Sequence, residues 1–136
     1  MNTMSNNQKV TPPREAPKVL LKEKEVYCVW MTLHRDFPKV ERFGIGNKIE
    51  QSFLDVLELT FASVYLVMDQ KILMLSKTIS KLDKLKFFLQ LAWESKLIKT
   101  DKYAIISTNL EEIGRQLGGW RNGLLKKIQE QKTPAK

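Results

Sequence analysis

The residues with the greatest catalytic potential are few, and their spacing argues against an active site. His34 is the only histidine and Cys28 the only cysteine of the 136-residue chain. Helical bundles that hold two metal ions use Glu-x-x-His motifs, but the residue three positions before His34 is Met31. The six-residue step from Cys28 to His34 is a helical rotation of about 240°, so the thiol and the imidazole would point apart. We therefore expect no catalytic residue, no metal ligand and no cofactor, and Cys28 as a small core residue.

Basic side chains at helical spacing indicate a different chemistry, the binding of phosphate groups. Lys77, Lys81 and Lys84 fall within about 60° of one another on a helix, away from the apolar residues of the same stretch. Arg115 and Lys126 share a face of a later stretch in the same way. A single stripe of this kind is most often a solvated helix face. Two stripes in a chain with formal net charge +8 favour a polyanionic partner, and we predict that these five residues contact RNA.

Length and composition limit the class of protein further. A chain of 136 residues with 43% hydrophobic content supports one globular domain with a packed core. No apolar run approaches the ~20 residues of a membrane span, and the first residues lack the apolar stretch of a signal peptide. A single cysteine cannot form an intrachain disulfide, which fits a reducing compartment. We expect a cytoplasmic protein that does not enter a membrane.

Apolar residues at steps of three and four predict the helices that must position these side chains. The predicted helices cover about residues 18–36, 47–68, 69–96 and 102–129. Pro38 ends the first helix, because proline disfavours helical backbone at the residue before it. Asn47 with Glu50 offers a capping box at the start of the second, and Thr100 is the expected N-cap of the fourth.

Strand signals are weak, since the β-branched residues follow helical spacing and no hairpin turn separates alternating runs. Four amphipathic helices with short joints predict an all-α fold, an antiparallel four-helix bundle. We place the bundle at residues 18–129, between disordered tails at residues 1–17 and 130–136.

Three glycines interrupt the best packing stripe of the chain. Gly114, Gly118 and Gly119 lie in the segment EIGRQLGGW, and each costs about 0.8–1 kcal/mol relative to alanine in a helix. The apolar seam nevertheless continues through Trp120, which predicts one unbroken helix. A pair of small residues four apart lets another backbone approach closely. That neighbour is either another helix of the same bundle or a second subunit.

Two large apolar residues lie off the seam of the third predicted helix. Phe87 and Leu91 are four residues apart and fall on the far side from most of the buried stripe. Exposed apolar pairs usually mark an interface, which favours a subunit contact. The alternative is that Phe87 and Leu91 pack under the first predicted helix.

Three segments of this chain read FPKVERFGIGNKIE, SKLDKLKFFLQLAWESKLI and LEEIGRQLGGWRN. In this order they resemble the accessory variability determinant (Avd) proteins of diversity-generating retroelements. The resemblance covers about Val26 to Asn122, with the segments in the same order. The wider four-helix-bundle family includes proteins encoded within intervening sequences of bacterial ribosomal RNA genes. Members of that branch usually carry an NIAEG-type segment in the second helix, where this chain reads LELTFASVYLV.

The resemblance implies a function that periodicity does not show. Avd-like proteins form rings of five bundles with a basic surface, and they associate with the retroelement reverse transcriptase and its template RNA. They lack catalysis of their own, because the polymerase makes the mutagenised cDNA used in retrohoming. The glycine–tryptophan motif of the family corresponds here to residues Gly114, Arg115, Gly118, Gly119 and Trp120.

We therefore expect a non-enzymatic homo-oligomer, most simply a pentamer, that binds structured RNA (or DNA in its place) and a reverse transcriptase. Because few aromatic side chains are expected at the surface, no stacking platform for bases is predicted. The alternative is a protein–protein scaffold of the wider family whose basic charge only keeps it in solution.

Overall fold

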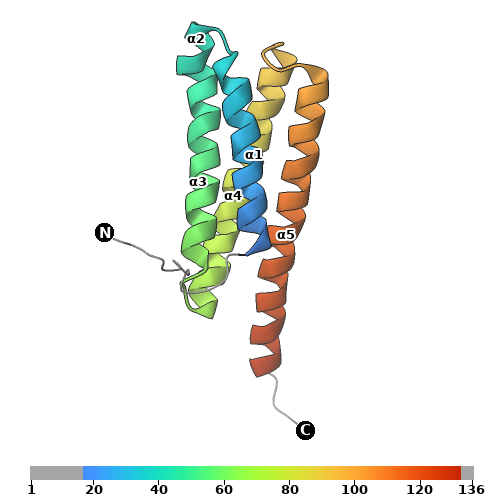
Figure 1. Ribbon diagram of the computed structural model, residues 1–136. Coiled ribbons are helices and arrows are strands. Elements are labelled where there is room, and N and C mark those ends of the chain that lie inside the picture. Colours follow the sequence, from blue (N-terminus) through green and yellow to red (C-terminus); the bar gives the residue numbers. More distant parts are fainter. Residues whose placement is uncertain (1–16, 133–136) are drawn as a thin grey trace, which may run out of the picture.

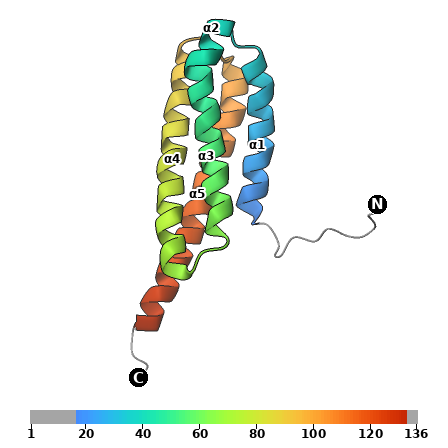
Figure 2. The same cartoon turned by 90° about the vertical axis from the view of Figure 1, so that its left-hand side faces the viewer.

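The computed structural model of the chain describes residues 17–132. The four long helices are α1 (Lys18–Arg35), α3 (Asn47–Ser63), α4 (Met68–Glu94) and α5 (Thr100–Lys132). They lie side by side in both views (Figures 1 and 2). Two short segments, α2 (Lys39–Glu41) and η1 (Arg42–Gly46), connect α1 to α3. Residues 17–132 contain no strand, so the prediction of an all-α four-helix bundle is confirmed.

The joint after α1 is more helical than the sequence indicated. α1 ends at Arg35, three residues before Pro38, and helical structure resumes immediately after that proline. A kink at Gly44, with φ −99° and ψ −106°, separates the incoming segment from α3. The predicted capping box does not form, because the residue before Asn47 already has helical angles and no side chain caps α3. Glu50 instead turns toward α1.

The second helix is shorter than predicted: α3 ends at Ser63 instead of residue 68, and Met68 is the first residue of α4. The remaining helix ends lie within a few residues of the predicted ones. α4 ends at Glu94 instead of residue 96, and α5 includes Thr100 as its first residue instead of using it as an N-cap. α5 also continues through residues 130–132, so the predicted C-terminal tail begins too early. Residues 1–16 and 133–136, the remainder of the two predicted tails, lie outside the described residues.

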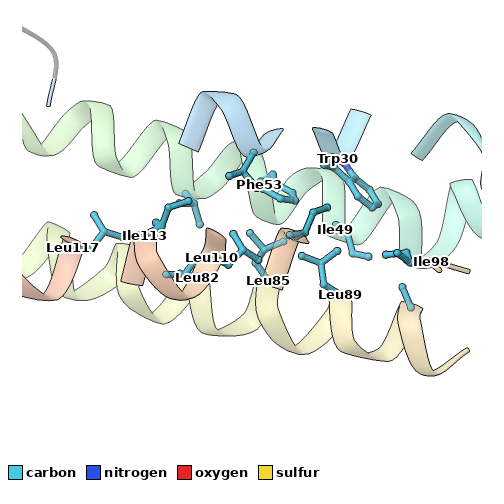
Figure 3. Packing of buried hydrophobic residues seen from close by; sticks show 14 of the residues in the cluster. Trp30, Ile49, Phe53, Leu82, Leu85, Leu89, Ile98, Leu110, Ile113 and Leu117 are labelled. Atoms are coloured by element: carbon cyan, nitrogen blue, oxygen red, sulfur yellow. The ribbon is translucent and has the colours of Figure 1, made fainter. Parts of the chain in front are cut away.

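The core follows the predicted apolar seams. Ile106, Leu110, Ile113 and Leu117 of α5 are all buried, and Trp120 packs partly against the same cluster. Their side chains meet those of α3 and α4 in one continuous row (Figure 3). Each fully buried Leu or Ile contributes about 1.5–3 kcal/mol relative to an exposed one. This row holds the outward-facing side chains of α4 and α5 in fixed positions.

α5 remains a single helix through its glycines, as predicted. Its C-terminal part continues beyond the end of the bundle where the α3–α4 connection lies (Figures 1 and 2). The α2–η1 segment and the α4–α5 connection both lie at the opposite end (Figure 1). The two ends therefore present different surfaces.

Candidate nucleic-acid interface

The three predicted lysines of α4 have different surroundings. Lys77 and Lys84 are exposed, whereas Lys81 is partly covered. The Lys81 Nζ atom lies 3.6 Å from Asp55 Oδ2 of α3. A solvent-accessible ion pair of this kind contributes only about 0–1 kcal/mol to stability, but it neutralises part of the field of Lys81. Among the described residues, the α4 stripe thus has two lysines without an ion pair instead of three.

On α5, Arg115 is engaged within its own helix. Its Nε and Nη2 atoms donate hydrogen bonds to Glu112 Oε1 at 3.0 and 2.7 Å. The hydrogen bond from Arg115 is the main reason that the pKa of Glu112 is lowered. Lys126, near the end of α5, is exposed. Of the two predicted cations on this helix, only Lys126 is free of a carboxylate among the described residues.

The predicted RNA-binding residues do not gather on one side of the bundle. Lys81 faces α3 through Asp55. Arg115 and Lys126 lie on the outer side of α5, away from the buried Leu117 of the same helix. The free lysines on α4 are the stronger part of the predicted surface.

The glycines of α5 do not share one explanation. A Cβ atom at Gly114 would make ordinary contacts, at 3.4 Å from Lys86 Nζ and 3.5 Å from Leu82 Cδ2. A Cβ atom at Gly118 or Gly119 would meet nothing within 4 Å. The close approach expected at the Gly114–Gly118 edge does not occur within the bundle, because a Cβ atom fits at Gly114 with ordinary contacts and at Gly118 with none. A contact with a second subunit stays a prediction.

Phe87 and Leu91 are exposed to 60% and 38%. The alternative that they pack under α1 is wrong, because α4 packs mainly against α3 and α5. Lys77 and Lys84 fall within about 80° of them around α4, so apolar and basic groups share this outer face.

Several aromatic side chains are exposed, although few were predicted at the surface. Phe43 is 76% exposed beside the Gly44 kink, and Phe61 and Tyr65 are about half exposed. The expectation of few exposed aromatics is therefore wrong. The one available signal was that Phe43 belongs to no apolar seam.

The single histidine belongs to a structural cluster between α1 and α3. Glu50 accepts hydrogen bonds from the Tyr27 hydroxyl and, at 2.9 Å, from Trp30 Nε1. His34 stacks on Trp30, with ring centroids 4.8 Å apart, and packs so closely on Gly46 that a Cβ there would lie 2.6 Å from Nε2. Burial and the hydrogen bond to Glu50 raise the pKa of Tyr27 to about 12. Cys28, predicted in the core, is exposed instead.

Glu23 is a second carboxyl between the same helices, and sequence reasoning missed it. Its side chain is 2% exposed, and Thr60 Oγ1 donates a 2.8 Å hydrogen bond to Oε2. Oε1 has no partner among the described residues. Burial raises the pKa of Glu23 to about 8. A shifted pKa can indicate catalysis, but the surrounding apolar side chains leave no space for even a water molecule.

The end of α4 contains the one non-glycine residue with positive φ among residues 17–132, Lys96 at φ 66°. The Leu97 N–H donates to the Ala92 carbonyl at 2.9 Å, which is the hydrogen bond of a Schellman ending. Glycine is the usual residue at this position, and a side chain costs about 1–2 kcal/mol.

Beside Lys96 lies an open hollow of ≈ 450 Å³ that Trp93, Lys99 and Thr100 also line. The Trp93 ring stacks on Tyr103 at 4.7 Å and donates through Nε1 to Thr100 Oγ1 at 3.0 Å. These two contacts hold the indole in a fixed orientation.

Comparison with known proteins supplies the family. Within residues 17–132, no group of His, Cys, Asp and Glu side chains is placed to hold a metal ion. No helix of that range is long and apolar enough to cross a membrane. No curated protein matches the chain. The model of the bAvd-like family matches residues 19–124, which include almost all of the bundle, and the chain therefore belongs to the bAvd-like family.

Proposed function

We propose that this chain is a non-catalytic accessory factor of a diversity-generating retroelement. An antiparallel four-helix bundle binds the structured template RNA through basic residues and associates with the reverse transcriptase in the cytoplasm. The polymerase then carries out the mutagenic cDNA synthesis that supplies retrohoming. Membership of the bAvd-like family supports this proposal, since the three quoted segments carry the same resemblance.

The observation that carries the RNA-binding part is the pair of free lysines on α4. Lys77 and Lys84 are exposed, and within residues 17–132 neither has a carboxylate at ion-pair distance. Free cations attract phosphate and release counterions from the nucleic acid, which makes the affinity salt-dependent. Lys126 adds a third free cation on α5.

The outer face of α4 supports the homo-oligomeric part of the proposal. Phe87 and Leu91 leave apolar surface uncovered by the described residues, and such surface usually marks an interface. The open space at Gly118 and Gly119 would let a second copy approach α5 closely. A ring of copies, a pentamer by resemblance, would repeat the free lysines around one axis.

A salt titration of RNA affinity with two matched double variants tests the proposal. Both Lys77→Gln with Lys84→Gln and Lys81→Gln with Arg115→Gln remove two positive charges. The first variant removes free cations, so we expect a roughly tenfold loss of affinity and a slope lower by about 1.4. The second removes cations already paired with carboxylates, so its effect should be much smaller.

Equal losses in the two variants would mean that net charge alone governs binding. No RNA binding by the unaltered protein would refute the RNA-binding proposal. Recovery of the protein from its native cell should bring a reverse transcriptase and one discrete RNA with it. Absence of both would contradict the accessory role.

The scaffold function has one observation in its favour. Lys81 and Arg115, two of the five predicted cations, are neutralised by neighbouring carboxylates. The scaffold function is supported if the protein captures the reverse transcriptase in the presence of ribonuclease but binds RNA with no salt dependence.

A further inference from the structure

The hollow beside Lys96 combines three features that suit one ligand. It is open and ≈ 450 Å³ in volume, which is within the ~300–1,000 Å³ range of small-ligand sites. Two of its lining residues, Lys96 and Lys99, are exposed lysines, and Glu94 is its one carboxylate. The Glu94 Oε2 atom accepts a hydrogen bond from Gln90 at 3.2 Å. The hollow therefore carries a net positive charge.

Trp93 provides the aromatic component of the hollow. Its indole is held by the stack on Tyr103 and by the hydrogen bond to Thr100, so little rotational freedom is lost when a ligand binds. A base that is not paired can stack on such a ring whatever its sequence, whereas a base inside a duplex cannot reach it.

The backbone of Lys96 has a conformation that a lysine adopts only at a cost in free energy. Its φ of 66° is a conformation that glycine adopts without strain. No residue within 17–132 forms an ion pair with Lys96, so no ion pair within that range offsets the strain. Strained non-glycine residues of this kind are concentrated at functional sites.

We propose that this hollow binds an unpaired nucleotide of single-stranded RNA, with a phosphate held by Lys96 and Lys99 and the base against Trp93. The inference rests on the proposed RNA-binding function and adds a second site, at the end of the bundle where α4 meets α5. The free lysines of α4 contact phosphates of either single-stranded or duplex RNA. The hollow selects single strands.

The test compares the full-length protein with Lys96→Gly for binding of a labelled poly-uridine oligonucleotide and of a duplex RNA of equal length. Lys96→Gly should weaken binding of the oligonucleotide severalfold and lower its salt slope by about 0.7. Binding of the duplex should not change. The same substitution should raise the melting temperature by about 4 °C, because the strain is removed. Lower affinity in a more stable protein cannot result from unfolding.

Lys96→Arg and Lys102→Ala are the matched controls. Lys96→Arg keeps the charge and should bind the oligonucleotide as the unaltered protein does. Lys102 is exposed near the start of α5 but does not line the hollow, so Lys102→Ala should leave the ratio of the two affinities unchanged.

An equal loss for oligonucleotide and duplex in Lys96→Gly, or no loss, would overturn the site while leaving the proposed function intact. A loss of oligonucleotide affinity in Lys102→Ala as large as that in Lys96→Gly would also overturn the site. An unaltered protein that binds neither RNA would overturn both proposals.

Discussion

The α1–α3 interface and the outer face of α4 both combine polar and apolar groups, but only at the first do side-chain hydrogen bonds within the chain satisfy most of the polar atoms. Glu23 Oε1 and His34 Nε2 are the buried exceptions among the described residues. Between α1 and α3, Glu50 accepts two side-chain hydrogen bonds and Glu23 accepts one from Thr60. On the outer face of α4, Lys84 has no carboxylate partner among the described residues, and Phe87 is 60% exposed.

The difference separates two uses of the same residue types. Groups that meet their partners inside the chain contribute to folding, since buried polar atoms cost free energy unless they are bonded. Groups that have no partner within residues 17–132 are candidates for contact with another molecule. His34 is held by its stack on Trp30 and its close packing on Gly46, although its buried Nε2 atom has no hydrogen-bond partner among residues 17–132. The lysines and phenylalanine of α4 are the functional candidates.

The largest effect should come from titration of Glu23. Its carboxyl is neutral in both states below pH 4.5, ionises only in the unfolded chain as pH rises, and ionises in the folded chain near pH 8. The unfolded state therefore binds fewer protons over this range, and the free energy of unfolding falls with rising pH. The full loss is on the order of 5 kcal/mol.

Urea unfolding of the unaltered protein and of Glu23→Gln, followed from acid to weakly alkaline pH, checks this expectation. The amide keeps the acceptor for Thr60 and cannot ionise, so the substituted protein should show a flatter dependence. Parallel pH profiles for the two proteins would mean that Glu23 is charged in the folded state.

Trp30→Ala breaks the other part of the α1–α3 interface. The indole is fully buried, packs on Phe37 and Phe53, and donates to Glu50. Its loss should lower the free energy of unfolding by about 3–5 kcal/mol. Val40→Ala is the control, because Val40 is 78% exposed and its truncation should change stability by under about 0.5 kcal/mol. Similar midpoints for the two variants in chemical denaturation would contradict the assigned core.

Phe87→Asp tests whether the outer face of α4 is an interface. Fold stability should change little, because Phe87 is exposed, whereas a buried charge at a subunit contact should dissociate the oligomer. Light scattering coupled to size exclusion should show a mass falling toward the 15.8 kDa of one chain. Phe43→Asp, at an exposed aromatic on η1, should leave the mass unchanged. A mass unaffected by Phe87→Asp would remove this face from the assembly.

The smallest effect is expected at Gly118. A methyl group there meets nothing within 4 Å, so Gly118→Ala should stabilise the helix by about 0.8–1 kcal/mol. Gly118→Leu should keep the fold but weaken assembly, if a second copy approaches this stretch of α5. Thermal melting measures the stabilisation by Gly118→Ala, and the oligomer mass measures the weaker assembly of Gly118→Leu. A lower melting temperature for Gly118→Ala would reveal a close neighbour within the bundle.

Much of the fold could be read from local pattern. The steps of three and four predicted the buried seam of α5 and its continuity through Gly114, Gly118 and Gly119. Pro38 marked the end of α1 to within a few residues. The kinked α2–η1 segment was missed, because glycines in a joint do not indicate whether the backbone stays helical around them.

The candidate site was predictable only in part. Lys81 and Lys84 are equivalent in sequence pattern, yet Asp55 on α3 lies near one and not the other. Glu23 reads as an ordinary surface residue until α3 covers it. The positive φ of Lys96 follows from the hydrogen bonds that end α4. It could not be predicted, because the sequence has no glycine or asparagine at this position to indicate it.

The sequence by itself determined the helices, their apolar faces, the excess of positive charge and the family. These properties depend on residues a few positions apart, or on composition, and need no knowledge of the fold. Only the tertiary structure decided which cations lack an ion pair within residues 17–132, which buried carboxyl has a raised pKa and which glycines face open space. Those properties depend on the helix that packs alongside, because a charge or a Cβ atom responds to neighbours in space and not in sequence.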